Sequence, residues 1–137
     1  MIPFLRRPAW IALALLVAAA LACGVDISTA HFEDAKLYQD RGGTAKTRTY
    51  SPADTFYCIA ALKKAPDSTP VEGVWQRVTI EGENREAIEV ARSAFTANNG
   101  TIVFESAPPA GGWPLGDYEV VLYLDGHRQL ALEFQVK

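Results

Sequence analysis

Apolar and polar residues alternate most regularly near the end of the chain, over residues 118–124 and 130–136. Alternation with a period of two is typical of strands that bury one face. The dipeptide Asp125-Gly126 separates the two runs and tolerates the positive φ angles of a tight hairpin turn. The sequence therefore predicts an antiparallel hairpin here. The face predicted to be buried carries Tyr118, Val120, Leu122 and Leu124 in the first strand.

Shorter apolar runs upstream predict further strands separated by turn signals. An edge strand is expected within 27–37, a central strand over 56–62, a strand over 71–81 that contains Trp75, and a short strand over 101–106. Residues 39–55 predict a long polar loop. Residues 98–100, Asn-Asn-Gly, predict a turn. The prolines expected to lie outside strand interiors are Pro66, Pro70, Pro108 and Pro109.

The segment 83–97 fits two kinds of element. It is rich in helix formers, and Ile88, Ala91 and Phe95 fall on one helical face. The strand alternative places Ile88, Val90 and Ala94 on one face, although Arg92 interrupts the pattern. The turn that follows and the surrounding strands favour the strand, and we predict one.

The N-terminal segment has the layout of a secretory signal. Arg6 and Arg7 precede an unbroken apolar run over 11–22, which is shorter than the ~20 residues of a membrane-spanning helix. An uncleaved anchor is the alternative, because 8–25 carries no charge. We predict a signal peptide at 1–22, a short tether at 23–26 and one folded domain over 27–137.

The residues around Cys23 indicate how the chain is processed. Ala20 and Ala22 satisfy the small-x-small rule for signal peptidase. The same residues followed by Cys23 resemble the bacterial lipobox, although Ala20 stands where leucine is more common. That resemblance implies cleavage between Ala22 and Cys23 and acylation of Cys23 with fatty acids such as palmitate. Gly24 rather than aspartate follows, which in Gram-negative lipoproteins implies sorting to the outer membrane.

The net charge of the processed chain disfavours partners that are themselves strongly acidic. All 16 acidic residues and 11 of the 13 basic residues follow Cys23, so the processed chain has a net charge of −5. An acidic chain is poorly suited to phosphate backbones, and no nucleic-acid partner is expected. The expected partners are the membrane, through the lipid, and an unidentified envelope protein or glycan.

Cys58 lies in the apolar run over 55–62. With Cys23 acylated, Cys58 has no cysteine to pair with, and a lone cysteine in such a run is typically a small buried hydrophobe. If Cys23 were a free thiol in an oxidising compartment, a Cys23–Cys58 disulfide would be the alternative.

Residues 112–137 resemble the terminal hairpin of immunoglobulin-like and fibronectin-III-like modules in bacterial envelope proteins. The shared pattern is Trp-Pro-x-Gly-x-Tyr-x-Val, an Asp-Gly turn and a closing x-Phe-x-Val. Its positions here are Trp113, Pro114, Gly116, Tyr118, Val120, Phe134 and Val136. The resemblance implies an all-β, single antiparallel sandwich of about seven strands, with Trp75 as its core tryptophan. It implies no activity.

No arrangement typical of a catalytic or metal site occurs in the sequence. His31 and His127 are far apart, no cofactor or metal is expected, and the chain is not expected to be an enzyme. Two alternatives are nevertheless considered. A dispersed catalytic site would draw on His31, Asp54 and Glu105, and Ca²⁺ would draw on Glu81, Glu83, Glu86 and Glu89 with Asn84.

Aromatic and basic residues supply the candidate contact surfaces. Trp113, Tyr123 and Tyr50 are candidates for contact with a protein or glycan partner, with packing in the sandwich as the alternative for Trp113. Arg41, Lys46 and Arg48 are spread along the polar loop and resemble a solubilising segment more than a headgroup site. The sequence thus predicts a lipid-anchored extracytoplasmic binding or structural module.

Overall fold

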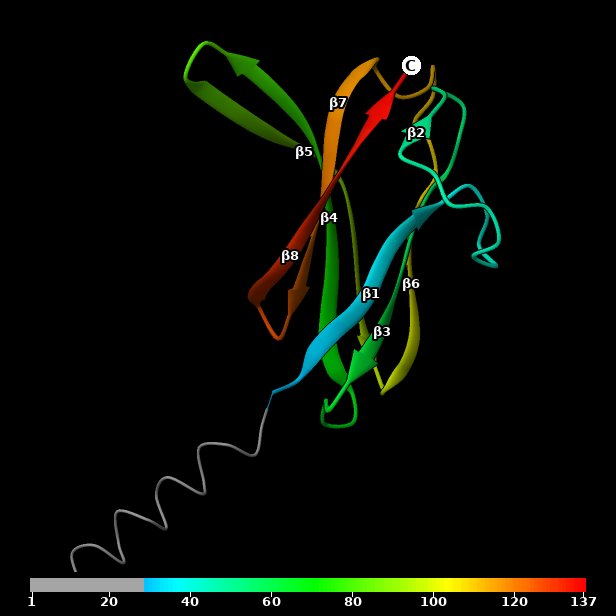
Figure 1. The fold of residues 1–137 in the computed structure, drawn as a ribbon, viewed down its shortest axis with the longest axis vertical. Helices are drawn as coiled ribbons and strands as arrows, with labels where there is room; N and C mark the ends of the chain where they lie inside the picture. Colours follow the sequence, from blue (N-terminus) through cyan, green and yellow to red (C-terminus); the bar gives the residue numbers. More distant parts are fainter. Residues whose placement is uncertain (1–28) are drawn as a thin grey trace, which may run out of the picture.

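The computed structural model describes residues 29–137, which form two β-sheets packed face to face (Figure 1). A three-stranded sheet has the order β1-β3-β6, and a five-stranded sheet has the order β2-β8-β7-β4-β5. The strands are β1 (His31–Tyr38), β2 (Thr49–Tyr50), β3 (Phe56–Lys63), β4 (Thr69–Glu81), β5 (Asn84–Ala97), β6 (Gly100–Ser106), β7 (Gly116–Leu124) and β8 (His127–Val136). The described residues contain no helix.

The C-terminal hairpin forms as its alternation predicts. Tyr118, Val120, Leu122 and Leu124 of β7 are all buried between the sheets. Asp125 and Gly126 adopt φ angles of 49° and 79°, the positive values that a two-residue hairpin turn requires. The prediction for this element is confirmed.

The core is built from aromatic rings of both sheets. Phe56 of β3 lies at its centre, with ring centroids 4.3 Å from Trp113, 4.8 Å from Phe134 and 5.3 Å from Trp75. Trp75 of β4 is fully buried. Such rings contribute large apolar areas and tilted or stacked contacts, so one aromatic cluster joins the two layers.

Residues 84–97 form strand β5, which confirms the strand prediction over the helix. β5 pairs with β4 along its whole length and is the outer edge of the five-stranded sheet. The pairing of β4 with β7 stops at Val78↔Asp117, whereas that of β4 with β5 continues to Glu81↔Asn84. The β4–β5 hairpin therefore projects beyond the sandwich (Figure 1).

Three details differ from the prediction. The sandwich has eight strands rather than seven, because Thr49 and Tyr50 form β2 inside the expected loop. β2 pairs in parallel with Gln135 and Val136 of β8, so the five-stranded sheet is mixed rather than purely antiparallel. A two-residue parallel contact leaves no alternating pattern for the sequence to reveal.

Pro70 is the third difference, because it lies inside β4 and was expected outside any strand. The β4–β7 ladder begins one residue later, at Val71↔Leu124. The Pro70 carbonyl accepts the turn N–H of Asp125 at 2.8 Å. Because the nitrogen of a strand residue faces the same side as its carbonyl, the missing N–H falls beyond the end of β7 and no ladder bond is lost.

Candidate functional site

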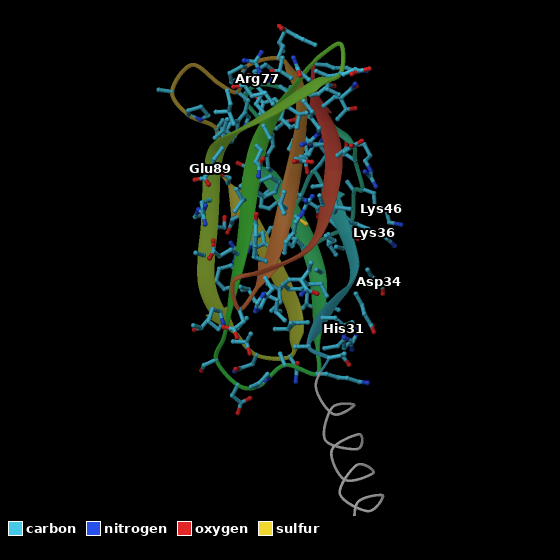
Figure 2. The ribbon with its side chains drawn as sticks, turned by 90° about the vertical axis from the view of Figure 1, so that its left-hand side faces the viewer. His31, Asp34, Lys36, Lys46, Arg77 and Glu89 are labelled. Atoms are coloured by element: carbon cyan, nitrogen blue, oxygen red, sulfur yellow. The ribbon has the colours of Figure 1, made fainter. Side chains whose placement is uncertain are left out.

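The two ends of the sandwich differ in what they carry. β1 begins at His31, at the end of the molecule where β3 finishes at Lys63. The part of the β4–β5 hairpin beyond the pairing of β4 with β7, residues 79–86, is called the overhang; it lies at the opposite end, which also holds the C-terminus (Figure 1). Figure 2 shows His31 near one end and Arg77, at the base of the overhang, near the other. We call these the tether end and the hairpin end.

A cleft of about 440 Å³ lies at the hairpin end, between the overhang and the outer face of the five-stranded sheet. Val78 and Ile80 of β4 form an apolar wall, and Ile80 is 65% exposed. The other lining residues are Arg48, Thr49, Arg85, Asp117, Tyr118, Glu133, Phe134 and Gln135. The cleft thus combines an apolar wall with charged groups of both signs.

Glu119 and Arg85 link the hairpin to the sheet beside this cleft. The Arg85 guanidinium donates to the Glu119 carboxylate at 2.6 Å. The Glu119 side chain is only 6% exposed, whereas that of Arg85 is 48% exposed. The hydrogen bond to Glu119, and then its negative charge, raise the pKa of Arg85. A carboxylate withdrawn from water needs such a partner, so this pair holds the overhang against the sheet.

Two further polar contacts shape the rim of the cleft. Arg48 donates to the backbone carbonyl of Glu133 at 2.9 Å, and Gln135 donates to the Asp117 carboxylate at 3.1 Å. Among the described residues, no cation is paired with the side-chain carboxylate of Glu133 or Asp117 within salt-bridge distance. The rim therefore offers carboxylates to a ligand.

Two of the three aromatic contact candidates are buried. Trp113 is 4% exposed, stacks on Phe56 and donates its indole N–H to the Asp54 carbonyl at 2.8 Å. Tyr50 is 1% exposed, and its hydroxyl donates to the Tyr38 carbonyl at 2.8 Å. Burial raises the pKa of Tyr50. Both residues pack in the sandwich rather than forming a contact surface, which was the alternative considered for Trp113.

Tyr123, the third candidate, is half-buried on the outer face of β7 beside Glu72. With Trp113 and Tyr50 inside, the three residues do not form the row of exposed rings that a glycan-binding surface requires. Of the three candidates, Tyr123 alone keeps a partly accessible ring.

The residues of the alternative dispersed catalytic site do not come together. His31 lies at the tether end, where its ring bonds the Thr29 carbonyl and Glu33. Glu105 of β6 lies opposite Tyr57, near the other end of β3, and pairs with Arg41. Asp54 accepts the Ser51 N–H at 2.8 Å in the loop before β3. His31 is therefore separated from Glu105 by most of the length of β3.

The acidic cluster considered for Ca²⁺ lies along the β4–β5 hairpin. Glu89 pairs with Arg92 at 2.6 Å, and this hydrogen bond lowers the pKa of Glu89. Within residues 29–137, no three His, Cys, Asp or Glu side chains lie close enough to hold a metal ion.

The basic residues of the 39–55 loop also diverge. Arg41 pairs with Glu105, whereas Lys46 and Arg48 lie with Lys36 of β1 around a separate shallow hollow. Figure 2 shows Lys36 and Lys46 close together on the same side of the molecule. The trio predicted from sequence therefore does not act as one patch.

Cys58 is buried in β3 as predicted, and it is the free cysteine of the part of the chain described. Burial raises the pKa of its thiol to about 12. A thiol that stays protonated at physiological pH is a poor nucleophile, so Cys58 is a packing residue.

The lipidation and cleavage residues Ala22 and Cys23, with the signal peptide and the tether, lie outside the described residues. Over 29–137, no helix is long and apolar enough to cross a membrane.

No protein-family model and no curated protein matches the chain. Among solved structures, the sandwich is similar to part of the Pseudomonas fluorescens alkylpurine DNA glycosylase AlkC bound to DNA containing an abasic site analog. The match has a TM-score of 0.49 and 13% sequence identity, and it covers 80% of this chain. The chain spans 31% of the length of that glycosylase chain.

This comparison corrects two expectations drawn from the sequence, that the chain is not an enzyme and that it has no nucleic-acid partner. A similar arrangement of strands occurs within a DNA-bound enzyme, so neither exclusion is retained. A likeness at this level gives no argument for an activity of this chain, because one fold hosts many functions.

The sequence does not predict the Arg85–Glu119 ion pair that links the overhang to the sheet. Glu119 lies on the face of β7 opposite Tyr118 and Val120, yet it is 4% exposed. Arg85 lay in the segment whose element was ambiguous. The pair forms only because the overhang bends across the sheet, and no local pattern in either segment signals that.

Proposed function

We propose that the chain is a lipid-anchored module outside the cytoplasm that presents its hairpin end to a partner in the cell envelope. One observation carries the proposal. Cys23 of the lipobox-like site lies seven residues before Ala30, and the described chain starts at the tether end, whereas the cleft lies at the hairpin end. An anchor at Cys23 would thus leave the cleft and the overhang directed away from the membrane.

Three features of the sandwich support an immunoglobulin-like or fibronectin-III-like module. The short β2 runs parallel to the last strand β8, and the strands divide into β1-β3-β6 and β2-β8-β7-β4-β5. Trp75 on β4 is fully buried between the sheets, where such a module places its core tryptophan. Tyr118, at the start of β7, donates its hydroxyl to the Pro114 carbonyl at 2.6 Å, which is the geometry of a tyrosine corner.

Gly24, rather than aspartate, after Cys23 supports delivery to the outer membrane in a Gram-negative host. The acidic net charge of −5 after Cys23 supports attachment through the lipid itself, because anionic headgroups would repel the processed chain.

Mass spectrometry of the mature N-terminus tests the anchor. We expect a chain that begins at Cys23 and carries the added mass of a diacylglycerol thioether. Cys23→Ser should release or mislocalise the domain, whereas Cys58→Ala should leave it in the membrane fraction. An intact Met1, or a free thiol on Cys23, would overturn the proposal.

A further inference from the structure

Exposed apolar residues concentrate at the hairpin end. Five large apolar side chains of the described chain are exposed, and four of them lie on the overhang or close to it. These are Ile80 at 65%, Ile88 at 56%, Val90 at 37% and Leu115 at 59% exposed. Every residue from Thr79 to Val90 is exposed. Solitary exposed apolar residues are ordinary, but a group on one projecting element indicates an interaction surface.

The backbone of β5 is also unpartnered along this stretch. The backbone of β5, an edge strand, pairs only with β4, so alternate N–H and C=O groups of 84–89 point away from the sheet. Lower on the strand the edge is tied to β6, because Ser93 donates to the Glu105 carbonyl at 2.7 Å and Phe95 packs on Phe104. The unpartnered part of the edge is therefore the end of β5 nearer the hairpin tip.

A bulge marks the lower limit of this edge. Trp75 pairs with Ala91 and the next residue, Gln76, pairs with Glu89, so Val90 is an extra residue in β5. A bulge interrupts regular pairing on an edge. The six residues of 84–89 above it keep an uninterrupted ladder with β4. We call this stretch the open edge.

Charge indicates which partner fits the open edge. Glu81, Glu83 and Glu86 surround the hairpin tip, and none has a cation within salt-bridge distance among the described residues. Arg85 is engaged by Glu119. Antiparallel pairing of two open edges would bring both sets of carboxylates into one short stretch, which disfavours a second copy. A partner with basic residues is favoured instead.

We propose that the open edge receives an extended segment of another protein by β-strand addition, and that this segment carries apolar and basic residues two positions apart. Glu86 and Ile88 lie on the same face of β5, so two residues of the added strand that are two positions apart meet a carboxylate and an apolar side chain. Main-chain bonds supply affinity in this mode and alternate side chains supply specificity. The inference names the partner of the module proposed above and rests on that function.

Fluorescence anisotropy with labelled eight-residue peptides tests the side-chain requirement. The full chain in neutral detergent is titrated with a Lys-Thr-Val-Thr repeat, called the Lys-Val peptide, in which lysine and valine lie two positions apart on one face. A Glu-Thr-Val-Thr repeat and an all-Lys peptide are the comparisons. We expect the Lys-Val peptide to bind at least tenfold more tightly than either of the others. Absence of Lys-Val binding, or equal binding of the all-Lys peptide, would overturn the proposal.

Matched variants locate the binding surface. Glu83→Lys with Glu86→Lys should weaken the Lys-Val peptide at least tenfold, and Ile88→Thr should weaken it severalfold while keeping a β-branched strand residue. Glu33→Lys with Asp67→Lys makes the same change of charge at the tether end and should leave affinity unchanged. Equal losses in both charge variants would show unspecific attraction and refute the open edge.

Hydrogen exchange distinguishes strand addition from other contacts. In the free chain, the outward amides of 84–89 should exchange rapidly, and saturating Lys-Val peptide should slow them at least tenfold. Binding without this protection contradicts strand addition. Slow exchange already in the free chain, with a dimer seen by sedimentation, would mean that a second copy covers the edge. Neither measurement involves the lipid, so a failure at Cys23 and a failure of the open edge are separable.

Discussion

The polar groups of Trp113 and Tyr50 explain why their burial was not predicted. Trp113 and Tyr50 were considered for a contact surface because each has a polar group that favours water. Both are buried because a backbone carbonyl accepts that group: Asp54 for the indole and Tyr38 for the phenol. A sequence shows that a side chain can donate a hydrogen bond, but not that a carbonyl from a distant segment lies within reach. Cys58, which makes no such demand, was placed correctly.

Removing the Tyr118 hydroxyl tests the value of such an internal bond. Tyr118→Phe deletes the donor to the Pro114 carbonyl while keeping the ring against Phe134. We expect a loss of about 1 kcal/mol in the free energy of unfolding, measured by urea denaturation. Tyr123→Phe is the matched control, because no bond from its hydroxyl occurs in the described structure, and it should change stability little. Equal effects of the two variants would contradict the account.

His31 gives a pH-dependent prediction. The hydrogen bond to the Thr29 carbonyl, and then the bond to Glu33, raise the pKa of His31 above 6.5 in the folded chain. A raised folded-state pKa contributes stability that is complete below the unfolded value and is lost as pH rises through the folded value. The stability lost on His31→Gln should therefore be larger at pH 5 than at pH 8, by urea denaturation.

An NMR titration supplies the control for His31. The pKa of His31 in the wild type should exceed 6.5, and Glu33→Gln should lower it. A His31→Gln penalty that is independent of pH, or a titration unchanged by Glu33→Gln, would contradict the assignment.

At the scale of elements, strands were predictable where alternation or a turn dipeptide is local. The β7–β8 hairpin follows from alternation and Asp125-Gly126, and β5 from its position before the Asn98–Gly100 turn. The predictions of an unbroken loop over 39–55 and of Pro70 outside any strand were wrong. Both features depend on where a neighbouring strand starts or stops. The Arg85–Glu119 pair was not predicted, because it depends on how the hairpin lies over the sheet. Sequence indicated the strands, and tertiary contacts determined the site.

Gly73 of β4 sets how closely the two sheets approach. A Cβ atom at this position would lie 2.9 Å from Cδ1 and 3.2 Å from Cβ of Phe104 in the facing sheet. Gly73→Ala should therefore cost about 1–3 kcal/mol of unfolding free energy, measured by urea denaturation, through overpacking. Adding Phe104→Leu to this variant should recover part of the loss, because it removes the ring that the methyl group meets. A neutral Gly73→Ala, or a double variant with fully additive losses, would contradict this packing.

In the whole molecule, the tether end and the hairpin end lie at opposite ends of the sandwich. The described chain starts at the tether end, and the cleft, the overhang and the open edge lie at the other. The 14 residues of β5 span roughly 45 Å at about 3.3 Å per residue. A lipid on Cys23 would hold one end near the bilayer through seven residues, Gly24 to Ala30, and keep the partner-binding end away from it.

Energy transfer to the membrane tests this direction. Fluorophores are attached at Asp67→Cys, near the tether end, or at Glu83→Cys, at the hairpin tip, in the full chain reconstituted into vesicles that carry an acceptor-labelled lipid. We expect clearly stronger transfer from position 67, because the length of the sandwich separates position 83 from the bilayer. Detergent should abolish transfer from both sites. Equal transfer from the two positions would mean that the sandwich lies flat on the surface, and stronger transfer from position 83 would reverse the orientation. Either result would remove the geometric basis for presenting the hairpin end to an envelope partner.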